Sequence, residues 1–175
     1  MPPRDYLKGI SQGEFLALFM EMRHASDRVA AISCVAYLDD TLGWALSARF
    51  VALGKQWEAR VFSGPDAPLG TLSAKIRLGY ALGLYGPMTC ADLDLIRAIR
   101  NDFAHTALPL SFADAGISGK VSRLKTPLPR GLGGPFPPND PKEIYAATVY
   151  QIALCVLGDL MNRQIQRPSF PPTLP

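Results

Sequence analysis

Apolar side chains recur every three or four residues along most of this 175-residue chain, and this spacing constrains the fold more than any other feature. In the segment 27–53, one such stripe holds Ala31, Val35, Leu38, Leu42 and Ala45, and Ile32 and Leu46 widen it. The spacing predicts a helix that buries one face, whereas strands would show alternation, which is scarce here. The sequence therefore predicts an all-α fold, a single-domain bundle of about five to six helices with this segment at its centre.

The same periodicity predicts four further helices, over 14–25, 71–84, 89–105 and 141–166. Ser26 and Thr89 supply side-chain oxygens that can cap the helices following them, and Asp92 would then lie in a first turn.

The inward-facing positions follow from the same spacing. In the segment 71–84 we expect them to be Leu72, Ile76, Leu78, Ala81 and Leu82. In the segment 89–105 we expect Ile96, Ile99 and Phe103, which lie within about 60° of one another on a helix.

The chain length fits one domain, which we place at residues 1–167. Inside it, 118–140 is rich in proline and glycine and predicts a long loop, basic through Lys120, Arg123, Lys125 and Arg130. The tail 168–175 cannot continue a helix because its prolines lack the N–H donor.

Composition narrows the class of protein. Apolar residues make up 48% of the chain and charged residues 19%, a composition that excludes a disordered chain. The net charge of +3 is too small to give the whole surface a positive potential that would attract nucleic acid. No signal peptide or anchor is visible at the start, and the apolar segment 144–162 contains Asp159, so we expect no membrane segment. Three widely spaced cysteines indicate a reducing cytoplasm, and with two distant histidines they predict no metal and no cofactor.

The sequence IRNDFAH, residues 99–105, raises the question of catalysis. Arg97, Asn101 and His105 stack at four-residue steps on the strip opposite the apolar face, and Arg100 lies at the flank of that face. Five residues of regular helix hold Arg100 and His105 about 140° apart. For these two to act together, the helix must end near Ala104, or a second subunit must supply one of them.

Two interpretations of this pair remain open. Histidine can move a proton and arginine can hold a phosphate, which together would cleave RNA without a metal. In the structural interpretation, which we favour, Arg100 pairs with an acid such as Asp39, Asp40 or Asp92, and His105 caps the last carbonyls. No catalytic residue is therefore favoured.

Other polar residues suit contacts better than chemistry. We expect one of Asp39 and Asp40 to pair with Arg28 or Arg100 and the other to be solvated. Lys75 and Arg77 follow a glycine and serine cluster that lacks the spacing of a phosphate-binding loop, so we interpret them as contacts to a partner or to acids on neighbouring helices.

Three stretches carry a family resemblance. PLGTLSAKIRLGYALGL (68–84), DLDLIRAIRNDFAH (92–105) and SDRVAAISCVAYLDDTL (26–42) together resemble the mannitol operon repressor family, over roughly residues 26–117. The resemblance implies an all-helical regulator that represses transcription of a sugar operon through other proteins. In agreement, no helix pair here carries a basic recognition helix beside a short turn, as direct readers of the major groove do.

A wider resemblance concerns the same histidine. RNDFAH (100–105) is similar to the Arg-polar-three-His signature of HEPN domains, which implies that Arg100, Asn101 and His105 could form a ribonuclease or RNA-binding site across a dimer.

We therefore predict a cytoplasmic, non-enzymatic transcriptional regulator that forms a homodimer and binds a DNA-binding regulator as its protein partner. Its predicted contact residues are Lys75, Arg77, Arg97, Arg100, Asn101 and His105. The alternatives are a HEPN-like, metal-independent ribonuclease or RNA-binding domain, and a dimer module with no activity of its own.

Overall fold

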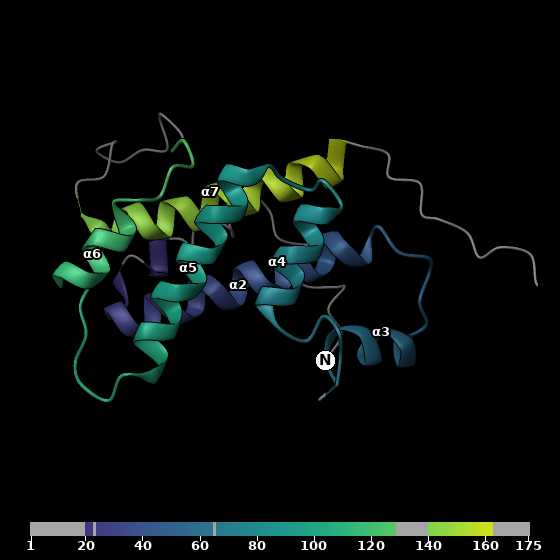
Figure 1. The fold of residues 1–175 in the computed structure, drawn as a ribbon, viewed down its shortest axis with the longest axis horizontal. Helices are drawn as coiled ribbons and strands as arrows, with labels where there is room; N and C mark the ends of the chain where they lie inside the picture. Colours follow the sequence, from purple (N-terminus) through teal and green to yellow (C-terminus); the bar gives the residue numbers. More distant parts are fainter. Residues whose placement is uncertain (1–19, 23, 65, 129–139, 163–175) are drawn as a thin grey trace, which may run out of the picture.

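The computed structural model describes residues 20–22, 24–64, 66–128 and 140–162 (Figure 1). Its helices are α2 (Asp27–Ser47), α3 (Lys55–Phe62), α4 (Leu72–Ala81), α5 (Pro87–His105), α6 (Ala115–Val121) and α7 (Pro141–Asn162). No strand occurs within the described ranges, so the all-α prediction is confirmed. Most of the predicted helix 14–25, part of the predicted loop and the tail 168–175 lie outside these ranges.

Helix α2 is the centre of the bundle, as its stripe predicts. It packs against α4, α5 and α7, and Figure 1 shows α2 and α7 running side by side while α4 and α5 cross them. The hydroxyl of Ser26 accepts the N–H of Val29 (3.4 Å), which confirms the predicted cap. The predicted stripe from Ala31 to Ala45 is buried, but Ile32 is not part of the buried face, because 36% of its surface remains exposed.

By length and composition alone, helix α2 is long and apolar enough to cross a membrane. Half of its most apolar stretch is buried inside the protein. Its inner face forms the core of the bundle. The segment 144–162, the most lipid-like on sequence grounds, lies within α7 and packs against that same face.

Three aromatic rings join the elements of the core. The ring of Phe103 on α5 lies 4.9 Å from that of Phe112, which lies 5.1 Å from that of Tyr145 on α7. The hydroxyl of Tyr145 donates to the carbonyl of Ala31 on α2 (3.2 Å). All three rings are buried, so they tie α5, α7 and the 106–114 segment to the central helix.

A carboxylate fixes the entry to α2. The side chain of Asp27 accepts the N–H of Phe112 and the hydroxyl of Ser111 (both 2.9 Å), and it pairs with Lys142 at 3.4 Å. Burial acts to raise the pKa of Asp27, but these hydrogen bonds and the Lys142 charge outweigh it and lower the pKa. The start of α2 is thereby held to the 106–114 segment and to the start of α7.

The start of α5 differs from the prediction. The helix begins at Pro87 with Gly86 as its N-cap, and Thr89 is inside it. Proline suits this position because its fixed φ fits the first turn and its missing N–H would be unpaired there anyway. Asp92 therefore lies beyond the first turn and is buried, where it accepts hydrogen bonds from Lys125 and Thr126.

The boundaries of α4 also differ from those expected. The helix stops at Ala81, and Gly83 follows with φ +67°, a left-handed conformation that glycine adopts without strain. Because the chain turns there, Ala81 and Leu82 are exposed rather than inward. Ile76 is buried as predicted, and Leu72 and Leu78 are half-buried.

Two short helices were not predicted. Helix α3 follows the turn after α2, and α6 begins just before the predicted loop 118–140 and extends into it as far as Val121. Helix α6 buries Ile117 and Val121 against the bundle, a four-residue repeat that is too brief to stand out in the sequence.

Candidate functional site

A groove of about 610 Å³ opens between α2, the beginning of α4 and the middle of α5. Its α2 wall is mostly apolar, through Ile32, Val35 and Ala36, and it also includes Asp39. The opposite wall is polar, so the groove has two chemically different sides. Its size lies in the range of clefts that hold small molecules or a protruding part of a partner.

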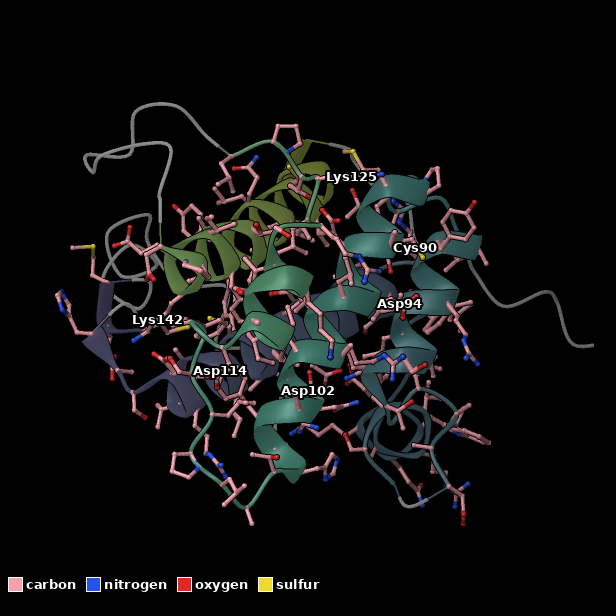
Figure 2. The ribbon with its side chains drawn as sticks, turned by 60° about the vertical axis from the view of Figure 1, so that its left-hand side comes forward. Cys90, Asp94, Asp102, Asp114, Lys125 and Lys142 are labelled. Atoms are coloured by element: carbon pink, nitrogen blue, oxygen red, sulfur yellow. The ribbon has the colours of Figure 1, made fainter. Side chains whose placement is uncertain are left out.

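The polar wall comes from one face of α5. Arg97, Arg100 and Asn101 are three and four residues apart, and all three line the groove. Arg100 Nη1 donates to Asn101 Oδ1 (3.2 Å). Arg97 Nε lies 3.6 Å from the exposed carboxylate of Asp94, which marks this stretch of α5 in Figure 2. The structure thus brings three of the six predicted contact residues together.

The beginning of α4 closes one end of the groove with Thr71, Leu72 and Ser73. The hydroxyl of Thr71 accepts the N–H of Ala74 (3.2 Å), so Thr71 caps the helix. The sequence contains the capping signal, but it does not say that this helix end faces the arginines of α5, because that depends on how the two helices pack.

Lys75 does not reach the groove surface as a free cation. Its side chain is 7% exposed, and Nζ lies 2.6 Å from Asp39 Oδ2 across the α2–α4 contact. The expectation that Asp39 or Asp40 pairs with Arg28 or Arg100 is therefore wrong. Arg28 instead donates to the carbonyls of Thr106 and Leu108.

Asp40 is exposed, as expected for the solvated member of the pair. Partial burial and the neighbouring Asp39 carboxylate raise its pKa, and the charge of Lys75 acts in the opposite direction.

A second, smaller cavity of about 250 Å³ lies on the other side of Asp39. It is lined by acids and aromatic rings, among them Glu58, Trp44 and Phe62. Glu58 is buried and accepts the hydroxyl of Ser47 (3.2 Å). Within the described ranges, no cluster of three histidine, cysteine or carboxylate side chains is arranged to hold a metal ion.

His105 lies apart from the groove. It is the last residue of α5 and is exposed, and Arg77 is likewise exposed on α4 outside the groove lining. Because α5 remains helical through His105, Arg100 and His105 stay about 140° apart in one chain. The arrangement can bind an anion at the arginines, but it does not place a histidine beside them within one protomer.

Comparison with known proteins adds an independent observation. No family model matches the sequence. The mannitol operon repressors of Escherichia coli K12 and of E. coli O6:H1 are each 34% identical to this chain over 59 residues, which are 34% of this chain and 30% of each relative. The aligned part of the chain thus spans less than a third of the length of these relatives.

The fold has a wider match. A chain in the X-ray structure of the MtlR–HPr complex from E. coli superposes with a TM-score of 0.65 at 18% identity, over 83% of this chain and 99% of that one. At this identity the likeness concerns the fold. The protein described here is accordingly similar to the mannitol operon repressors, in sequence over a third of its length and in fold over most of it, which confirms the resemblance carried by its motifs.

Proposed function

We propose that this protein is a non-enzymatic regulator of the mannitol operon repressor type, which acts by binding a protein partner on the face formed by α2 and α5. The observation that carries the proposal is an exposed apolar stripe on α2, formed by Val29, Ile32 and Ala36, beside the arginines of the groove. Val29 is 52% exposed although it lies on the central helix. A mixed apolar and cationic patch of this kind is typical of a docking surface.

The partner that we propose is HPr. The fold match belongs to a complex that contains HPr. Among the described helices none has the basic recognition surface of a direct DNA reader, so a regulator of this kind would need other proteins to reach its operon. A second partner that reads DNA, a homodimer and a cytoplasmic location belong to the same proposal. Light scattering of the purified chain measures the dimer directly.

Replacing Ile32 with glutamate is expected to weaken HPr binding at least tenfold, because a carboxylate would be desolvated in the centre of the apolar stripe. Isothermal titration calorimetry with the HPr of the same host measures the affinity, and circular dichroism checks folding. Met88→Glu is the matched control, since Met88 is 44% exposed on the first turn of α5 and does not line the groove. Absence of binding by the unmodified chain, or equal weakening by both variants, would refute the proposed surface.

A ribonuclease is the second candidate, and one observation favours it: Arg100 and Asn101 line an open groove. His105 would then have to come from a second subunit, because it does not line the groove of its own chain.

Our proposal predicts no cleavage of labelled single-stranded RNA in the presence of a chelator. Cleavage that is lost in both Arg100→Ala and His105→Ala, with folding intact, would establish the ribonuclease in place of the regulator.

A further inference from the structure

We propose that the polar end of the groove binds a small organic phosphate, with its phosphoryl group between α5 and the first turn of α4. This site lies on the same α2 and α5 face that we propose for the protein partner, and the inference rests on the proposed function only in this shared location. Binding of the phosphate itself needs no partner.

The charges at the polar end of the groove favour an anion. Arg97 and Arg100 both line the groove, and the one carboxylate among the lining residues, that of Asp39, is already paired with Lys75 at 2.6 Å. The carboxylate of Asp94 is 56% exposed and 3.6 Å from Arg97, so it offers weak and solvent-screened compensation. Two guanidinium groups therefore share one cleft with an excess of positive charge, which an oxyanion would neutralise.

The two facing walls of the groove also supply hydrogen-bond donors. Arg97 Nε makes no hydrogen bond within the described part of the chain, although the carboxylate of Asp94 lies 3.6 Å from it. On the facing side, Leu72 and Ser73 occupy the first turn of α4, where backbone N–H groups precede the first intrahelical acceptor. Thr71 satisfies the N–H of Ala74 but leaves these two available. A phosphate between the walls would meet donors from both helices, and the positive end of the α4 dipole favours the same charge.

The rest of the groove has room for an organic body attached to the phosphoryl group. The groove volume of about 610 Å³ exceeds what a bare phosphate fills, and Ile32, Val35 and Ala36 form an apolar wall opposite the arginines. A molecule that carries a phosphoryl group on a compact organic body would occupy both walls. A small organic phosphate therefore fits the groove better than an inorganic ion alone.

The test is calorimetric titration of the full chain with phenyl phosphate, with inorganic phosphate and phenol as the two halves of the probe. We expect one site per chain, weaker binding of inorganic phosphate and no binding of phenol. Arg97→Gln and Arg100→Gln should each weaken phenyl phosphate binding by roughly tenfold or more, because each removes a charge-assisted hydrogen bond. Arg77→Gln, an exposed arginine on α4 outside the groove, should leave it unchanged.

One further variant tests the site with both arginines in place, so its result does not depend on whether the arginine variants fold. Ala36→Phe adds bulk to the exposed apolar wall without altering charge, and it should weaken phenyl phosphate binding by narrowing the groove opposite the arginines. No binding to the unmodified chain, or equal losses in Arg77→Gln and Arg100→Gln, would overturn the inference. HPr affinity is measured separately without phosphate, so failure of the partner proposal and failure of the phosphate site give different results.

Discussion

Replacing Asp92 with alanine is expected to lower the free energy of unfolding by about 3 kcal/mol, because it removes the shared acceptor of two partly buried backbone donors and one hydroxyl. Asp92 is 1% exposed. Its carboxylate accepts the N–H of Lys125 (3.0 Å) and both the N–H and the hydroxyl of Thr126 (2.6 and 2.7 Å). These bonds fasten the segment after α6 to the first half of α5, and alanine would supply no acceptor in their place.

Urea unfolding followed by circular dichroism measures this loss. Asp94→Ala is the matched control, because Asp94 lies two positions further along the same helix and is exposed, as Figure 2 shows. A surface substitution of this kind should change the stability by no more than about 0.5 kcal/mol. Asp92→Asn keeps one acceptor oxygen and should fall between the two. Equal stability of Asp92→Ala and Asp94→Ala would contradict the assigned role.

Replacing Phe103 with alanine is expected to destabilise the protein by about 3–5 kcal/mol, as large-to-small changes of buried aromatic residues do. The side chain is fully buried, and its ring is one end of the chain of contacts through Phe112 to Tyr145. Removing it leaves a cavity where α5 meets the 106–114 segment, and it removes one aromatic pair worth about 1 kcal/mol beyond the buried area.

Thermal and urea unfolding of three variants would separate cavity formation from loss of any aromatic residue. Phe103→Leu retains most of the volume and should lose less than half as much stability. Trp57→Ala removes a ring that is 59% exposed and stacks on Arg60, so it should have little effect. If Phe103→Ala unfolds at the same urea concentration as Trp57→Ala, this region does not form part of the core.

Helix α5 shows how far sequence periodicity carries the prediction. The predicted buried face is fully buried and consists of Ile96, Ile99 and Phe103. A helix with one solvent-exposed face must repeat its apolar residues at this spacing. The start of the helix was misplaced, since Thr89 and Pro87 both carry starting signals and only the packed structure selects between them.

The candidate site was only partly predictable. The helical wheel identified Arg97 and Asn101 as exposed, but no local signal could show that the end of α4 faces them. Lys75 was predicted to contact a partner or an acid on a neighbouring helix, and it pairs with Asp39 of α2. The sequence could not name this acid, because Asp39 lies 36 residues earlier and meets Lys75 only through the packing of α2 on α4. Pairings of this kind are set by tertiary structure, and a periodic pattern carries no information about them.

The parallel arrangement of α2 and α7 has a consequence for the order of synthesis. The hydroxyl of Tyr145 reaches the carbonyl of Ala31 across 114 positions of sequence, so α2 receives this neighbour only after more than a hundred further residues have been made. At about 5–20 residues per second, the ribosome needs roughly 5 to 20 seconds to pass from the end of α2 to the start of α7. Throughout that interval the nascent chain exposes the apolar face of α2, because α7, its most extensive packing partner, has not yet been synthesised. The exposed face leaves α2 open to chaperone binding and to premature association.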